Sequence, residues 1–234
     1  MRRSKDVLLA LAWLLPASPT KNAVLRALGH AVHPTARARS NLIWRVRSIE
    51  MGPASRIGRF NVVKNLRLLR LGREASIGRM NLISAHPVYG RLYPSGASTV
   101  LGQNAYITSR HSIDCSGPVT VEDFAAVAGH RTTILTHSVD LRTDAQVAHP
   151  VTVGARSFVS TNCLLVGGAA LPAHSVLAAG AVLSRTRTAG EPGLWGGVPA
   201  RRIGEIDGEW FTRSRTHTHR VHVPETGETV DEAF

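Results

Sequence analysis

A six-residue period in the C-terminal half of the chain is the feature that most limits its fold. Aliphatic residues recur at every sixth position, namely Val153, Val159, Leu165, Leu171, Leu177 and Leu183. Small residues stand four positions after the first five of these, namely Ser157, Cys163, Ala169, Ser175 and Ala181. A period of six matches neither the helical repeat of about 3.6 residues nor the two-residue alternation of a strand.

This period predicts a triangular coil of about eighteen residues, with three short strands and three turns at each level. The aliphatic side chain points into the prism, and the small residue fits where the chain turns a corner. The pattern returns upstream with less regularity, at Ile57-Gly58, Leu71-Gly72, Ile77-Gly78 and Leu101-Gly102. We therefore expect an all-β fold, a hexapeptide-repeat solenoid, over residues 51–206.

The period also divides the chain into segments. Two interruptions, near 85–98 and 136–150, are expected to project as loops, which is where functional groups tend to lie on a solenoid. Residues 1–50 are expected to form an N-terminal helical or irregular segment. Residues 207–234 are expected to form a C-terminal tail.

The N-terminal segment is expected to contain two short helices. The apolar stretch Val7–Leu15 is too short to span a bilayer, and Pro16 follows it without a clear cleavage site, so we interpret it as a retained helix rather than a signal peptide. Ser18 is expected to cap the second helix, with Gly29 just past its end. This pair either contacts a membrane peripherally or packs on the rest of the protein.

The charge is strongly basic, with 28 Lys and Arg against 16 Asp and Glu. The arginines are scattered from Arg2 to Arg220 and are neither massed on one helix nor regularly interleaved with aromatic residues, which disfavours a nucleic-acid partner. Anionic cofactor phosphates, an acidic membrane surface and scattered solvated charges remain as explanations. Two cysteines without zinc or CxxC spacing indicate a reducing, cytoplasmic location, with membrane association as the alternative.

Three segments carry a resemblance to a known family. They are VTVGARSFVSTNCLLVGGAALPAHSVLAAGAVLS at Val151–Ser184, GGVPARRIGEI at Gly196–Ile206 and LTHSVDL at Leu135–Leu141. With them, residues 51–206 resemble the hexapeptide-repeat acyltransferases, among them galactoside and maltose acetyltransferases and polysaccharide O-acetyltransferases. The resemblance implies a left-handed parallel β-helix, an exception to the right-handed crossover rule. It also implies acetyl-CoA as acyl donor, no metal, and a homotrimer with active sites between neighbouring prisms.

The LTHSVDL segment supplies the expected catalytic base, His137. A neutral imidazole near pH 7 is suited to take the proton of an attacking hydroxyl. Asp140, three residues further on, is expected to hold the ring in the required tautomer. A local turn contact or solvation is the alternative for Asp140, and His130 is interpreted as structural.

The resemblance to galactoside acetyltransferase also implies the residues that bind the cofactor. They are Thr161 beside the thioester, Ala179 at the pantetheine arm, Ser184 and Arg185 near the cofactor, and Arg201 at the nucleotide phosphates. An arginine fork suits phosphate. Ser160 and Ala178 stand where the family usually has glycine and leave less room for the cofactor arm. In the alternative interpretation, the small residues serve only to turn corners.

The expected function is O-acetyl transfer from acetyl-CoA to a sugar hydroxyl of a cell-surface polysaccharide or another glycan. An amino-sugar N-acetyltransferase and a non-catalytic binding scaffold are the alternatives. A γ-class carbonic anhydrase is disfavoured, because the histidines lack the spacing of its three zinc ligands. In the tail, His217, His219 and His222 either hold a metal or belong to a disordered or packed end.

Overall fold

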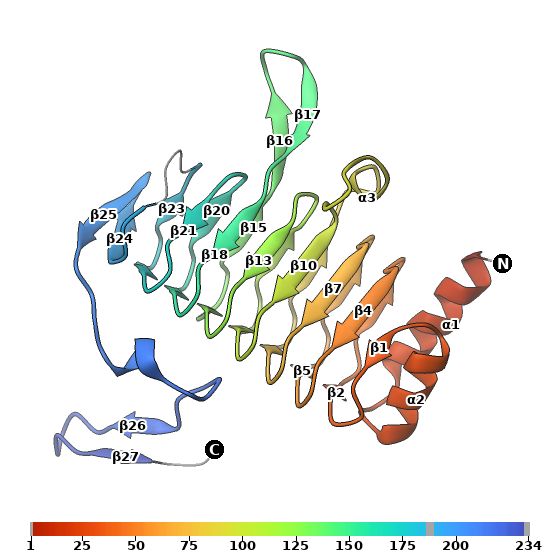
Figure 1. Cartoon of the computed structure of the whole chain (residues 1–234), viewed down its shortest axis with the longest axis horizontal. Helices are drawn as coiled ribbons and strands as arrows, with labels where there is room; N and C mark the ends of the chain where they lie inside the picture. Colours follow the sequence, from red (N-terminus) through yellow and green to blue (C-terminus); the bar gives the residue numbers. More distant parts are fainter. Residues whose placement is uncertain (1, 186–189, 232–234) are drawn as a thin grey trace.

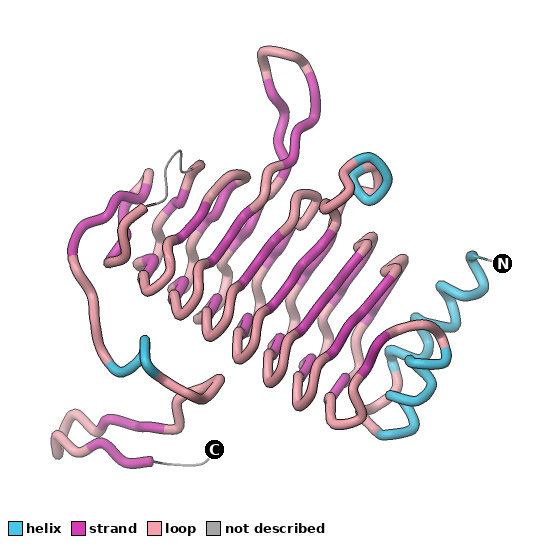
Figure 2. The backbone as a smooth tube through the Cα atoms, in the orientation of Figure 1, coloured by secondary structure: helices cyan, strands magenta, loops and turns pink. Residues whose placement is uncertain are grey.

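The computed structural model describes residues 2–185 and 190–231. These residues form a triangular prism of stacked coils, each coil being one turn of a β-helix (Figures 1 and 2). Three ladders of mostly parallel strands make its sides: sheets A and C with seven strands each and sheet B with nine. The predicted fold class, an all-β left-handed parallel β-helix with short N-terminal helices and a C-terminal extension, is confirmed.

The strands follow one another from sheet A to sheet B to sheet C in every coil. Sheet A contains β1 (Ala31–Val32), β4 (Ser48–Met51), β7 (Leu68–Leu71), β10 (Ser98–Leu101), β13 (Val119–Val121), β18 (Val151–Val153) and β21 (Ala170–Leu171). Sheet B contains β2 (Arg37–Ala38), β5 (Arg56–Ile57), β8 (Ser76–Ile77), β11 (Tyr106–Ile107), β14 (Ala126–Val127), β19 (Phe158–Val159), β22 (Val176–Leu177), β24 (Leu194–Gly197) and the antiparallel β25 (Ala200–Gly204). Sheet C contains β3 (Leu42–Trp44), β6 (Val62–Lys64), β9 (Leu82–Ser84), β12 (Ser112–Asp114), β15 (Thr133–Leu135), β20 (Leu164–Val166) and β23 (Val182–Leu183).

The six-residue period describes the prism interior directly. Each of its six aliphatic side chains is at most 1% exposed, and each of the five small residues at most 2%. Upstream, the coils are longer, because eight residues rather than six separate the inward residues of sheets C and A, as from Ile113 to Val121. A strict six-residue period falls out of register wherever eight residues separate two inward positions, so the pattern weakens in the upstream coils.

The β-helix begins earlier than the sequence predicts. Val32 of β1 pairs in parallel with Met51 of β4, so residues 31–50 form the first coil rather than an irregular segment. Large residues, His33 and Arg39, follow the inward Val32 and Ala38 of this coil where later coils often carry glycine. The glycine that often follows the inward residue is therefore missing here, although the small Ala36 stands four positions after Val32.

Helices α1 (Arg2–Leu14) and α2 (Pro19–Ala27) cover the open end of the prism (Figure 1). Ser18 caps α2 by accepting a hydrogen bond from the backbone N–H of Lys21, as predicted. The buried Lys21 Nζ donates to the carbonyls of Trp13, Leu15 and Arg39, and burial lowers its pKa to about 8. These bonds tie both helices to the first coil. No described helix combines the length and apolarity needed to cross a bilayer.

A ladder of buried polar side chains runs along the corner between sheets B and C. Asn41 Oδ1 accepts the backbone N–H of Asn61, and Asn61 Oδ1 accepts that of Asn81. Asn81 Oδ1 accepts the N–H of His111, whose Nδ1 accepts the N–H of Thr132. Burial lowers the pKa of His111 to about 4, so the ring stays neutral and can accept this bond. The ladder satisfies one corner amide in each of these coils.

Two insertions leave the prism where the chain passes from sheet C to sheet A. The first contains the short helix α3 (Tyr89–Leu92) and the second is an antiparallel hairpin, β16 (His137–Asp140) with β17 (Ala145–Ala148). Both project from the same edge of the prism (Figures 1 and 2). They lie within the two interruptions of the sequence period.

The C-terminal residues turn back across sheet B instead of extending away from the prism. The 3₁₀ helix η1 (Glu209–Thr212) places the Trp210 ring 5.1 Å from that of Phe158, and the His217 ring lies 4.4 Å from that of Tyr106. A small hairpin, β26 (Arg220–His222) with β27 (Thr229–Asp231), follows. Among residues 2–185 and 190–231, no cluster of three His, Cys, Asp or Glu side chains could hold a metal ion.

Candidate active site

A histidine–aspartate pair lies at the corner between sheets C and A. Strand β12 ends at Asp114, and its neighbour β15 ends at Leu135, two residues before His137. The parallel pairing of Asp114 with Leu135 brings the next residues of the two coils together. His137 Nδ1 lies 2.5 Å from Asp114 Oδ2, and the backbone N–H of His137 donates to the same oxygen at 3.1 Å.

The carboxylate of Asp114 is surrounded by donors. Its Oδ1 accepts the backbone N–H and the hydroxyl of Ser116, and its Oδ2 also accepts the hydroxyl of Thr136. Burial alone would raise the pKa of Asp114, but the hydrogen bonds from Ser116 and His137 outweigh it and lower the pKa below its ordinary value. Asp114 is therefore ionised at neutral pH.

This arrangement fixes the tautomer of His137. A carboxylate can only accept, so Nδ1 carries the hydrogen that it donates to Asp114, and the lone pair is left on Nε2. The His137 side chain is 37% exposed, whereas that of Asp114 is 14% exposed. The imidazole can therefore take a proton from a bound hydroxyl, while the aspartate orients it from behind.

The α3 insertion forms a wall beside the imidazole. The ring of Tyr89 lies 6.1 Å from that of His137, and His86 packs edge-on against Tyr89 at 6.3 Å. The backbone N–H of His86 donates to the Ser116 hydroxyl, which itself donates to Asp114. Tyr89 is 9% exposed, and burial raises its pKa. Two insertions and one coil corner thus build the site together.

Asp140 does not contact His137, contrary to the sequence prediction. The two residues stand three positions apart on β16, so their side chains point to opposite faces of the hairpin. Asp140 pairs with Ala145 at the far end of the hairpin, and its carboxylate accepts the backbone N–H of Arg142. Asp114 takes the place predicted for Asp140. It could have been found only by stacking the preceding coil in register.

Thr161 and Ala179 lie together at a different corner, between sheets B and C. Thr161 follows β19 and Ala179 follows β22, one coil further on. The Thr161 hydroxyl donates to the carbonyl of His130, and the Thr161 carbonyl accepts the N–H of Gly180. The side chain of His130 is exposed in the coil before. One chain alone does not bring this corner to His137.

The remaining predicted cofactor residues lie near the C-terminal end of the β-helix. Ser184 and Arg185 follow β23, on the same edge as His137 and two coils beyond it. The Arg185 side chain covers Gly168, where a Cβ would stand only 2.7 Å from Arg185 Cγ. Arg201 lies on β25 opposite Gly196, and its exposed guanidinium donates to the neighbouring carbonyl of Ala200. Both arginines present charge to solvent.

Comparison with known proteins finds similarity to solved structures alone. No protein-family model and no curated protein matches the chain. The solved structures similar to it include a hexapeptide-repeat acetyltransferase, O-acetyltransferases and an N-acyltransferase from Bacillus cereus.

Three neighbours illustrate this. A hexapeptide-repeat acetyltransferase of Vibrio cholerae O1 biovar eltor, solved with acetyl coenzyme A, is 18% identical over 88% of this chain and 87% of its own, with a TM-score of 0.46. A polysialic acid O-acetyltransferase is 17% identical over 75% and 84%, with a TM-score of 0.49. A maltose O-acetyltransferase from Clostridium difficile 630 is 14% identical over 88% and 87%, with a TM-score of 0.43.

Proposed function

We propose that the chain is an acetyl-CoA-dependent O-acetyltransferase with His137 as its general base. The observation that supports this most directly is the His137–Asp114 pair, which leaves Nε2 free at an exposed edge. The acceptor hydroxyl gives its proton to Nε2 as its oxygen attacks the thioester carbonyl. The tetrahedral intermediate then expels the coenzyme A sulfur, which takes the proton back from the imidazolium. This route requires neither a metal nor an acyl-enzyme.

The cofactor is proposed to lie along the coils that follow His137. Thr161 offers a hydroxyl beside the thioester, Ala179 an exposed corner for the pantetheine arm, and Ser184 a polar group nearby. Arg185 and Arg201 are proposed to bind the nucleotide phosphates, because planar guanidinium groups match phosphate geometry. The exposed guanidinium of Arg201 is consistent with this role.

A homotrimer would complete the site, and the outer face of sheet C supports this proposal. Leu42, Val62 and Leu82 stand in register along its first three strands. Leu42 is 46% exposed, Leu82 39%, and Leu135 on the same sheet 42%. Exposed apolar ladders of this kind mark interaction surfaces. Sheet C joins the Thr161 corner to the His137 corner, so a neighbouring chain packed there would bring a second Thr161 corner toward His137.

The acceptor is proposed to be a sugar hydroxyl of a cell-surface polysaccharide or another glycan, with the reaction placed in the cytoplasm. This choice rests on the sequence resemblance. An amino group on a sugar is the alternative acceptor, and a panel containing both kinds of sugar separates the two.

Calorimetry with acetyl-CoA on the wild type and on His137→Ala, followed by coenzyme A release with that panel, tests the proposal. We expect both proteins to bind and only the wild type to release coenzyme A, with the base worth about 10²- to 10⁴-fold. His33→Ala, an exposed histidine of the first coil, is the matched control and should behave as wild type. Absence of binding in every protein would leave a non-catalytic scaffold.

A further inference from the structure

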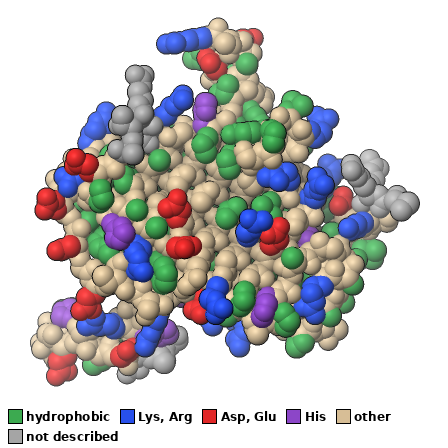
Figure 3. All heavy atoms as spheres, viewed as in Figure 1, with side chains coloured by type: hydrophobic (Ala, Val, Ile, Leu, Met, Phe, Trp, Pro, Cys, Tyr) green, Lys and Arg blue, Asp and Glu red, His purple; other side chains and the backbone are tan. Residues whose placement is uncertain are grey.

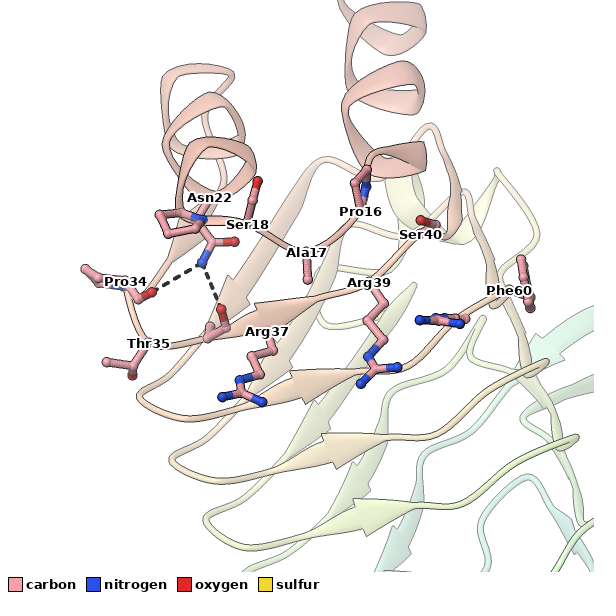
Figure 4. Close-up of a pocket in the computed structure, with 13 residues that line it drawn as sticks. Pro16, Ala17, Ser18, Asn22, Pro34, Thr35, Arg37, Arg39, Ser40 and Phe60 are labelled. Atoms are coloured by element: carbon pink, nitrogen blue, oxygen red, sulfur yellow. Dashed lines mark hydrogen bonds between the residues drawn. The ribbon is translucent and has the colours of Figure 1, made fainter.

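Four arginines gather at the N-terminal end of sheet B. Arg37 of β2 and Arg56 of β5 are direct cross-strand partners, and Arg39 and Arg59 follow at the ends of the same two coil sides. A cavity of about 830 Å³ is lined by Arg37, Arg39 and Arg59, and one of about 320 Å³ by Arg37, Arg39 and Arg56. Figure 4 shows Arg37 and Arg39 side by side below the loop that joins α1 to α2.

These four guanidinium groups form no ion pair within the part of the chain that the structure describes, although Glu74 lines a further cavity together with Arg56. Within that part, no Asp or Glu residue lines either of the first two cavities, and no described residue forms an ion pair or hydrogen bond with the four side chains. Like charges directly opposite one another destabilise a sheet. On sheet A, by contrast, the cross-strand partner of Arg70 is Glu50, at 2.6 Å, and both signs are interspersed on the face shown in Figure 3. The two cavities that Arg37 and Arg39 both line thus hold positive charge without an acidic residue among the described ones, which favours an external anion.

The helix next to this cluster exposes an apolar side. Leu8 and Leu11 of α1 are 55% and 57% exposed, and their spacing of three places them on one side of the helix. Leu15, directly after the end of α1, is 47% exposed. The opposite side of α1 packs on the prism through Leu9 and Trp13, which are buried. A helix that is apolar all round is normally covered on every side.

The apolar helix and the arginine cluster adjoin each other. The loop after Leu15 lines the larger cavity with Pro16 and Ala17. Across that cavity stands Phe60, which is 63% exposed (Figure 4). The apolar residues and the arginines therefore line the same cavity.

We propose that the N-terminal end of the protein binds a bilayer containing anionic lipids. The surface concerned, called here the N-terminal docking surface, consists of Leu8, Leu11, Leu15, Arg37, Arg39, Arg56 and Arg59. The leucines enter the boundary between headgroups and acyl chains, and the guanidinium groups bind lipid phosphates. Charge decides the occupant, because the four arginines favour an anionic partner, whereas a second copy of this chain carries a net charge of +12. The N-terminal docking surface is separate from the His137 edge, so it does not depend on the proposed enzymatic function.

Vesicle co-sedimentation of the full chain tests this surface directly. We expect binding to phosphatidylcholine vesicles that contain about 30% phosphatidylglycerol, and little to pure phosphatidylcholine, because each arginine near an anionic surface is worth about fivefold in affinity. Arg39→Gln should weaken binding about fivefold, and Leu11→Gln should also weaken it. Neither side chain makes a hydrogen bond to a described residue, so both variants should fold. Arg142→Gln, in the hairpin distant from α1 in Figure 1, is the charge-matched control and should bind as wild type.

Several results would overturn the proposal. Equal binding to both kinds of vesicle, or none to either, would remove the anionic bilayer as occupant. An equal loss in Arg142→Gln would show that net charge alone drives binding. Displacement by inorganic pyrophosphate at constant ionic strength would assign the cluster to a soluble phosphate group. A smaller assembly for Leu11→Gln in size-exclusion chromatography, with vesicle binding unchanged, would assign α1 to a contact between subunits.

Discussion

Asp114→Asn isolates the residue on which the proposed base depends. The carboxylate receives five hydrogen bonds, and all five come from donors that need an acceptor. One carboxylate oxygen accepts from Ser116, and the other accepts from Thr136 and His137. An asparagine offers one oxygen and one NH₂ group, so its NH₂ group must face the donors on one of these two sides, and it cannot accept their hydrogen bonds. If the NH₂ faces His137, the ring is pushed to the tautomer with hydrogen on Nε2, which cannot accept a proton. If the oxygen faces His137, the tautomer survives but the negative charge is lost.

The loss of the negative charge is the smaller of these two effects, so it sets the minimum fall in kcat that we expect. Two opposite unit charges about 4 Å apart attract by about 4 kcal/mol at an effective dielectric constant near 20. Because the His137 side chain is 37% exposed, we reduce this to about 2–3 kcal/mol, or about 30- to 150-fold in kcat. The larger effect removes the whole contribution of the base, about 10²- to 10⁴-fold.

The assay is release of coenzyme A, followed by its thiol, with the preferred sugar or with water as acceptor. We expect kcat to fall by at least about 30-fold while the affinity for acetyl-CoA is unchanged. Asp140→Asn, which alters the aspartate favoured by the sequence, should remain within about twofold of wild type. A loss below about threefold in Asp114→Asn, or an equal loss in Asp140→Asn, would refute the assignment of Asp114.

Two further predictions follow from the core and from sheet C. The buried His111 has a pKa of about 4, against 6.5 in the unfolded chain, so the unfolded state binds the proton more tightly and stability falls as pH drops through this range. Between pH 7 and about 4.5, the free energy of unfolding is expected to fall by about 2 kcal/mol through this group. His111→Asn, which copies the residue of the preceding coils, should remove this part of the pH dependence in urea titrations. An unchanged pH dependence in the variant would contradict the reasoning. Leu82→Arg should convert the proposed trimer to monomers, as measured by light scattering, and should lower coenzyme A release. Val221→Arg on the C-terminal hairpin is the control and should change neither. A trimeric Leu82→Arg protein would exclude sheet C as the contact between subunits.

The interior of the prism could be predicted because it repeats at fixed spacing. Each inward residue between Val153 and Leu183 meets the same environment six positions later, so periodicity alone identifies the core. The first coil escaped prediction because large residues follow its inward positions. The eight-residue sides upstream also change the spacing, as between Ile113 and Val121. Where the repeat length varies, local sequence no longer determines which residues become neighbours.

Only part of the candidate site could be predicted, because local sequence does not show which residues the stacking of coils brings together. His137 could be chosen from its segment, but its partner Asp114 lies 23 residues earlier in the chain and becomes adjacent only once the coils are stacked. Proximity in sequence favoured Asp140, and strand geometry turns that residue away. The arginine cluster has a similar origin, because Arg37 and Arg56 become neighbours only through the pairing of the first two coils.

The exit of both insertions from one corner has a consequence for how such a protein can change. Val121 pairs with Val153 across the hairpin in the same parallel register in which Leu101 pairs with Val121 across an uninterrupted coil. The stack therefore tolerates detours of different length and sequence at this corner without any adjustment inside the prism. Under the proposed function, the inward residues of the coils would determine stability, whereas the two insertions beside His137 would contribute to the choice of acceptor, so the two properties could be inherited separately. A descendant could acquire a new acceptor by exchanging one short segment, while selection on the remaining coils continued as before.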